Sequence, residues 1–203
     1  MRYFLFLIVT YFSLDVTAQR FPSEVWHKGK VVLLEGDTIS GQVRYSQETD
    51  IVELMLEESN TAIALTGRKL LYFEIFDALS NRYREFYALP FAVNGSYEIP
   101  ILFEVIHEGR PKSLLSRERI ENQVVTSPYT MGGAFSRLVL KYSYYFLNQK
   151  GKISLVGKSK KELIHTFRDK NTAMKKFIKS NKIRPERRQD LLKTIIYYNS
   201  LFE

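Results

Sequence analysis

The chain has 203 residues, of which 45% are hydrophobic and 26% are charged, and its formal net charge is +8. This composition excludes an intrinsically disordered protein, because it supplies enough apolar side chains for a packed core. The absence of cysteine excludes disulfides, thiol nucleophiles, thiolate-bound metals and a lipid anchor on an N-terminal cysteine.

Residues 1–18 have the pattern of a cleaved export signal. Arg2 gives a positive start, and an apolar run of 12 residues extends from Tyr3 to Leu14. A membrane-spanning helix needs about 20 apolar residues, so the run favours a signal peptide over an anchor. We therefore expect cleavage between Ala18 and Gln19, an exported protein, and no transmembrane span in the mature chain.

Residues 19–157 read as a β-rich domain of short strands and tight turns. In the strongest segment Leu71, Phe73 and Ile75 alternate with polar and aromatic residues, which is the period of a half-buried strand. The same pattern predicts strands at 31–34, 38–45, 51–56, 70–77, 82–89, 101–108, 113–117, 137–147 and 152–156.

The stretch 119–136 lacks this alternation and contains Ser127-Pro128 and Gly132-Gly133. It is therefore predicted to be a long mobile loop within the β domain. The strand that follows it, 137–147, is expected to be the longest, with its apolar side chains on one face.

After Gly157 the apolar period changes from two to about 3.6, which predicts a helical C-terminal segment at 158–203. Ser159 and Glu162 have the spacing of a capping box, and Pro185 suits the first position of a third helix. We expect these helices to pack on the β domain. The predicted fold class is α+β, an antiparallel β-sandwich or open barrel followed by C-terminal helices.

The positive charge is concentrated in the C-terminal third. Residues 19–136 contain 12 Lys and Arg against 16 Asp and Glu, whereas residues 137–203 contain 17 against 5. Such a field attracts anionic lipid or polysaccharide, although a solvated lysine face that keeps the protein soluble explains the same pattern. The candidate anion-binding residues are Lys160, Lys161, Lys175, Lys176, Lys179, Arg187 and Arg188.

Catalytic patterns are not found in the sequence. His27, His107 and His165 are far apart and lack the spacing of a metal pair, and neither an HExxH nor a GxSxG motif occurs. The sequence therefore predicts no catalytic, cofactor-binding or metal-binding residue, and it favours a protein that is not an enzyme.

Several segments together resemble a family of small uncharacterised exported proteins of Bacteroidota: "GKVVLLEGDTISGQVRY", "RYREFYALPF", "ILFEVIHEG", "YSYYFLNQKGKI" and "DLLKTIIYYNSLFE". The family has no known activity, so the resemblance implies only a cell-envelope setting and a shared fold. A periplasmic or outer-membrane-associated location is expected, with secretion as the alternative. Nucleic acid is not an expected partner.

Three functional hypotheses remain at the level of sequence. The leading one is a non-enzymatic binding or scaffolding role for an unknown envelope component. The first alternative is binding to an anionic lipid or polysaccharide surface through the basic helices. The second alternative is an enzyme whose site is assembled from residues distant in sequence.

Overall fold

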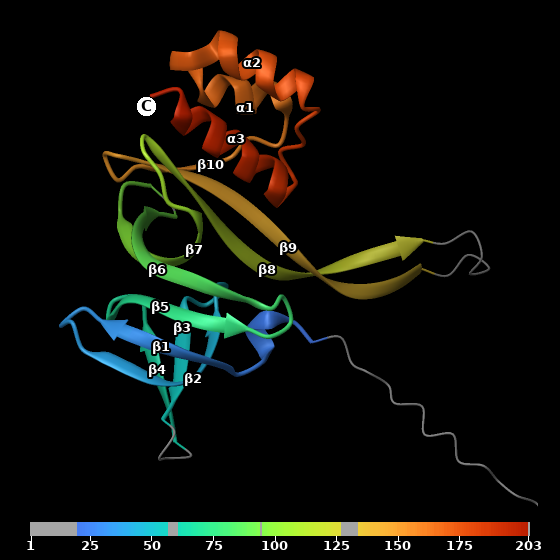
Figure 1. The fold of residues 1–203 in the computed structure, drawn as a ribbon. Helices are drawn as coiled ribbons and strands as arrows, with labels where there is room; N and C mark the ends of the chain where they lie inside the picture. The colour runs from blue at the N-terminus through green and yellow to red at the C-terminus, as the bar shows by residue number, and fades with distance from the viewer. Residues whose placement is uncertain (1–19, 57–60, 94, 127–133, 203) are drawn as a thin grey trace, which may run out of the picture.

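The computed structural model of the chain describes residues 20–56, 61–93, 95–126 and 134–202. The predicted signal peptide, including Ala18 and Gln19, lies outside these residues. Within them the chain forms ten strands followed by three α-helices (Figure 1). The elements are β1 (His27–Leu33), β2 (Thr38–Ser46), β3 (Ile51–Met55), β4 (Ala62–Thr66), β5 (Leu70–Asp77), β6 (Arg82–Ala92), β7 (Glu98–His107), β8 (Lys112–Thr126), β9 (Ala134–Asn148), β10 (Ile153–Leu155), α1 (Lys160–Thr166), α2 (Asn171–Ser180) and α3 (Arg188–Ser200).

The strands form one antiparallel sheet in the order β10-β9-β8-β7-β6-β5-β1-β2-β3-β4. Strands β4 and β10 are its two ends, so the sheet is not closed. The prediction of an antiparallel β fold followed by C-terminal helices is confirmed at this level. Strand β4 was not predicted, because its short segment alternates too weakly to be recognised from sequence.

The first of the two larger cores lies on the inner face of β1 to β7. Inward-facing residues alternate along the strands, and in β5 the predicted inward residues Phe73 and Ile75 are fully buried. The prediction is wrong for Leu71, which is 45% exposed because the ladder with β1 shifts between Val32 and Leu33 and skips it. Phe73 stacks on Phe86 of β6 with 4.5 Å between ring centroids, and such pairs add to the free energy of burial.

Two glycines face each other across β1 and β2, where neighbouring strands approach closely. Gly29 pairs with Gly41 in the ladder. A Cβ on Gly29 would overlap the carbonyl oxygen of Glu74, and one on Gly41 would overlap that of Met55. Only glycine allows the neighbouring backbones to approach this closely.

The second core lies between the helices and the β8–β9 hairpin, where the three helices gather at one end of the molecule (Figure 1). Phe167, which ends α1, packs on Phe146 of β9 with 5.3 Å between ring centroids. The predicted capping box is confirmed: Ser159 Oγ accepts from the Glu162 amide, and the Glu162 carboxylate accepts from the Ser159 amide.

Two sequence predictions are corrected in this half of the chain. The third helix begins at Arg188 and not at Pro185, because the amide of Arg184 donates to the Asp190 carboxylate at 3.0 Å and holds residues 184–187 as a turn. The predicted loop at 119–136 is wrong for residues 119–126 and 134–136, which extend β8 and β9. Their ladder continues without a shift as far as Thr126 opposite Ala134.

The hairpin was missed because its polar residues satisfy each other across the strands and break the apolar alternation within each strand. Arg137, for example, donates to the side chain of Gln123 directly opposite. Among the helices in the described part of the chain, none combines the length and apolarity that crossing a bilayer requires.

Candidate functional site

An arginine is the centre of the most distinctive cluster of polar groups in the molecule. Alternation along β6 directs Arg84 and Phe86 into the core, and Tyr83 and Glu85 outward. Arg84 is only 2% exposed. A buried charge is costly unless it is paired and hydrogen-bonded, so its partners decide whether the fold can tolerate it.

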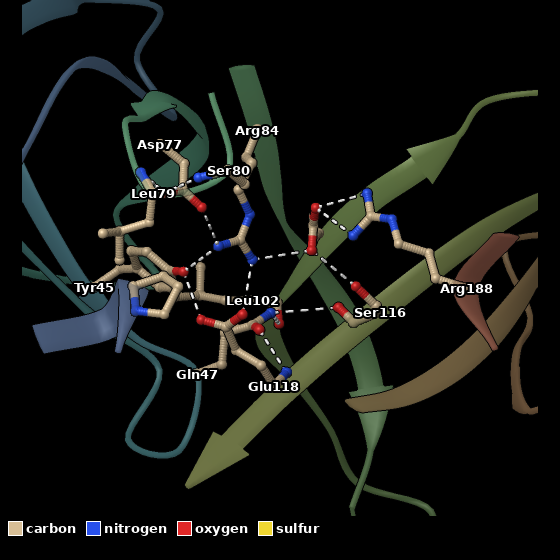
Figure 2. Close-up of polar contacts among 12 residues, drawn as sticks. Tyr45, Gln47, Asp77, Leu79, Ser80, Arg84, Leu102, Ser116, Glu118 and Arg188 are labelled. Atoms are coloured by element: carbon tan, nitrogen blue, oxygen red, sulfur yellow. Dashed lines mark hydrogen bonds and ion pairs between the residues drawn. The ribbon is translucent and has the colours of Figure 1, made fainter. Parts of the chain in front are cut away.

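The Arg84 guanidinium is surrounded by groups from four other strands, as Figure 2 shows. Its Nη1 donates to the Tyr45 hydroxyl at 2.7 Å and to the Asp77 carboxylate at 3.3 Å. Its Nη2 donates to Glu104 at 3.0 Å and to Glu118 at 2.8 Å. The side chain therefore connects β6 with β2, β5, β7 and β8.

Glu104 on β7 is the second centre, because two further arginines reach it. Its Oε1 accepts from Arg82 Nη2 at 2.9 Å and from both terminal nitrogens of Arg188 at 3.0 Å. Its Oε2 accepts from Ser116 Oγ and from Arg84, both at 3.0 Å. Since Arg188 is the first residue of α3, this carboxylate ties the helical segment to the sheet.

The end of β2 is connected to β7 and β8 through side chains. Tyr45 donates to Glu118 at 2.5 Å. Gln47 donates to the carbonyl of Leu102 at 2.9 Å and accepts from the amide of Glu118 at 2.8 Å. An amide side chain thus links strands that are not neighbours in the sheet.

A smaller ion pair continues this connection toward the surface. Arg117 donates to Asp50 at 2.9 Å and to the carbonyl oxygen of Gln47. Asp50 also accepts from the amide of Leu102 at 2.8 Å. Both links hold the β2–β3 turn against β7 and β8.

The charges in the cluster balance, and their ionisation follows from the contacts. Burial would raise the pKa of Glu104, but Arg84 and then Arg188 outweigh it and lower that pKa from 4.5 to about 2. Burial raises the pKa of Tyr45 well above 10, so its phenol stays protonated and donates to Glu118. Arg82, Arg84 and Arg188 therefore face three carboxylates, Asp77, Glu104 and Glu118.

Every carboxylate oxygen in this cluster has a donor. Asp77, for example, accepts from Arg84 with one oxygen and from the amides of Leu79 and Ser80 with the other. Carboxylates whose oxygens are all occupied by donors in this way are poor general acids or bases. The cluster is suited to fixing elements against each other.

In contrast to these carboxylate oxygens, one nitrogen of Arg84 lacks a hydrogen-bond partner among the described residues. This nitrogen is the Nε, which is buried. The guanidinium carbon lies 4.9 Å from the ring centroid of Phe86, within the range of a cation–π contact. The aromatic face compensates in part for the missing hydrogen bond.

A polar hollow of about 430 Å³ opens beside the cluster, at the point where the β8–β9 hairpin leaves the body. Gln47, Arg117 and Glu118 line its inner side, and Glu48 and Glu121 line its rim. Glu118 of the charge cluster thus borders this hollow, although its carboxylate is already occupied by Tyr45 and Arg84.

The seven predicted anion-binding residues divide into two groups. Six are exposed on the helical segment: Lys160, Lys161, Lys175, Lys176, Lys179 and Arg187. Arg188 is half-buried and belongs to the charge cluster through Glu104. Anion binding by the exposed six stays a prediction.

The histidines lie apart, as the sequence spacing indicates. His27 is buried with its Nε2 2.7 Å from the Pro22 carbonyl oxygen, His107 is half-buried, and His165 is exposed. Within the described residues, no group of three or more His, Asp or Glu side chains is arranged to hold a metal ion.

Sequence reasoning missed the charge cluster. One signal was available, because Arg84 has the same parity along β6 as the apolar Phe86 and the opposite parity to Glu85. An arginine on an inward-facing position requires buried acids. Which acids they are depends on the sheet order, since Glu104 and Glu118 are 20 and 34 residues away.

Comparisons of the chain with protein-family models, with curated proteins and with solved structures found no match.

Proposed function

We propose that the protein is a non-enzymatic component of the cell envelope that binds or scaffolds another component. The observation that carries this proposal is the saturated charge cluster, which joins five strands and α3. Its groups are engaged with each other, so its physical effect is rigidity. A rigid body with a projecting hairpin and a basic helical face suits a scaffold.

The envelope setting rests on the signal pattern of residues 1–18 and on the resemblance to exported proteins of Bacteroidota. We propose in addition that the curled sheet is an open barrel and not a sandwich. The side-chain links from Gln47 to Leu102 and Glu118 support this description, because they join the end of β2 to β7 and β8, which are not its neighbours in the sheet.

The test is fractionation of the native cell combined with chemical crosslinking. The proposal expects the protein in the periplasmic or outer-membrane fraction, with Gln19 as its first residue by mass spectrometry, and crosslinked to a defined envelope component. A full-length protein that stays in the cytoplasmic fraction would contradict it.

The enzyme alternative has its own test. The purified protein would be screened for hydrolase and transferase turnover alongside the variants Glu118→Gln and Glu48→Gln, which alter the inner side and the rim of the polar hollow. Turnover that either variant abolishes, while the variant melts like the wild type, would overturn the non-enzymatic proposal.

The second candidate function is binding to an anionic lipid or polysaccharide surface. It is favoured by the six exposed cations of the helical segment, none of which forms an ion pair with another residue in the described ranges. Unpaired surface cations attract anionic surfaces, and salt screens the attraction.

Vesicle sedimentation at low salt tests this candidate. Charge reversal at Lys175, Lys176 and Lys179 of α2 is expected to reduce binding to anionic vesicles at least tenfold. Reversal of three exposed cations of the β region is the matched control and should retain most of the binding: Lys28 on β1, and Arg68 and Lys69 in the β4–β5 turn. Equal losses in the two triple variants would remove the helices as the binding site.

A further inference from the structure

The β8–β9 hairpin projects from the body as an isolated two-stranded arm (Figure 1). We define the arm as residues 119–126 and 134–141. Strand β7 pairs with β8 only as far as Ser116, and β10 pairs with β9 only from Tyr145 to Leu147, so these residues pair only with each other in the described part of the chain.

The two faces of the arm differ in chemistry. Paired residues share a face, and the arm's four charges, on Arg119, Glu121, Arg137 and Lys141, all lie on one face. That face also carries Val125, Val139 and Phe135, of which Phe135 is 49% exposed. The opposite face, called the apolar arm face below, carries no charge. Its four ladder pairs are Ile120 with Leu140, Asn122 with Leu138, Val124 with Ser136, and Thr126 with Ala134.

The apolar arm face is exposed and continues the core under the helices. Val124 is 67% exposed and Leu138 is 45% exposed. Further along the same face of the hairpin, Tyr144 and Phe146 are buried against the helices. The helices therefore cover one end of this face and leave the arm open, and the pair of Glu118 and Tyr142 lies between the two.

An isolated two-stranded hairpin is marginally stable in water, and its apolar face needs a cover. We propose that the cover is the same face of a second copy of this chain, packed about a twofold axis. The uncharged face avoids the repulsion that a net charge of +8 imposes elsewhere on two copies. The arm's four charges remain in solvent on the outer sides of the pair.

The size of the face agrees with a reversible dimer. Eight residues per strand at about 3.3 Å each give a face of about 26 Å in length, and two such faces bury on the order of 1,000 Å². That area is about the smallest that a specific interface requires. The dimer is therefore expected to dissociate on dilution.

The geometry of the ladder fixes which pairs lie nearest the axis. The apolar arm face has four pairs, and the two middle ones are Asn122 with Leu138 and Val124 with Ser136. In an antiparallel packing of two arms the twofold axis passes between these two pairs. The Asn122 amide, which is both donor and acceptor, then lies close to its own copy.

The absence of cysteine allows a direct test by crosslinking. Packed sheets lie about 10 Å apart, a distance that a short bismaleimide spans. The variant Asn122→Cys is expected to give a covalent dimer in high yield at about 50 µM protein. The variant Gln123→Cys is the matched control, because its side chain lies on the opposite face, and it should give little. Equal yields, or none from Asn122→Cys, would overturn the proposal.

Sedimentation equilibrium gives an independent measurement. The wild type is expected to be dimeric at about 100 µM, and Leu138→Glu is expected to be monomeric at the same concentration. Arg137→Glu introduces the same side chain one residue away on the charged face and should remain dimeric. Far-UV circular dichroism and Trp26 fluorescence confirm that each variant is folded.

A wild type that is monomeric at about 100 µM would overturn the proposal. So would loss of vesicle binding in Leu138→Glu without a change in mass, which would assign the apolar arm face to a lipid surface. These readouts measure mass and crosslinking, so they are distinguishable from the tests of export and turnover above.

Discussion

At the scale of residues, the fold depends on an arginine in the core. Arg84 has three carboxylates and a phenol within hydrogen-bond distance. A buried pair adds little net stability compared with an apolar substitute, but removing one partner leaves uncompensated charge. Replacement of the arginine alone therefore leaves buried carboxylates without their counter-charge, which lowers the free energy of unfolding.

We predict that Arg84→Met destabilises the protein by about 3–5 kcal/mol, because Glu104 and Glu118 lose their shared donor. The measurement is urea denaturation. Arg82→Met is the control: its side chain is 37% exposed, and it also contacts Glu104, so its loss should cost about 1 kcal/mol or less. Equal costs for the two variants would contradict a central role for Arg84.

Glu104 gives a prediction on pH. Its pKa in the folded protein is about 2, below the reference value of 4.5. The stabilisation, about 3 kcal/mol, is therefore fully present above pH 4.5 and is lost as the pH falls toward 2. Denaturation between pH 5 and pH 2 should show this slope, and Glu104→Gln should flatten it. Glu98→Gln, at an exposed position, should leave the slope unchanged.

At the scale of elements, α3 is held to the sheet by the side chain of Asn199, which hydrogen-bonds to the backbone of β8 as a neighbouring strand would. Asn199 accepts from the Lys112 amide at 3.2 Å and donates to the Lys112 carbonyl at 2.9 Å. Both backbone groups of Lys112, the first residue of β8, are thereby satisfied by the helix. Together with Arg188 at the other end of α3, this contact holds the helix along its length.

We predict that Asn199→Ala costs about 1–3 kcal/mol, because it leaves two backbone groups without partners. Hydrogen exchange at the Lys112 amide should accelerate more than exchange elsewhere in β8. Ser200→Ala alters the exposed next residue of α3 and should have no such local effect. An unchanged Lys112 exchange rate would show that the contact does not protect this amide.

The elements also show how far sequence reasoning reaches. Strand β5 was predicted with its bounds, and the capping box of α1 was predicted with its contacts, because both are local patterns. The arm was missed because its residues are satisfied across the hairpin and not along the strand. The charge cluster was missed because Arg84 meets Glu104 and Glu118 only after the strands have taken their places in the sheet.

At the scale of the whole molecule, the helices and the sheet share one core and one charge cluster. Leu114 and Phe146 of the hairpin are buried together with Leu163 and Leu191 of the helices. Arg188 adds the ion pair to Glu104. The helical segment has no separate interior, so it is not expected to remain folded without the sheet.

We predict a single cooperative unfolding transition. The fluorescence of Trp26, the one tryptophan of the chain, reports the beginning of β1, and circular dichroism at 222 nm reports the helices. The two denaturation curves should coincide. The variant Phe167→Ala removes a ring from the shared core. The free energy of unfolding should fall by about 3–5 kcal/mol, and by the same amount in both curves. Helical signal lost at a lower denaturant concentration than the fluorescence change would contradict this prediction.

The position of β1 between β2 and β5 has a consequence for the newly made chain. All other neighbouring strands are consecutive in sequence. The second neighbour of β1, however, is β5, which is synthesised only after β2, β3 and β4. Until Leu70 and the residues after it have emerged, the edge of a four-stranded meander stays unpaired and can join the edge of another chain. Lys28 and Lys30 lie on that strand, and lysines on an exposed edge discourage such pairing. The lysines of β1 thus discourage pairing with the edge of another chain until β5 has been synthesised and pairs with β1.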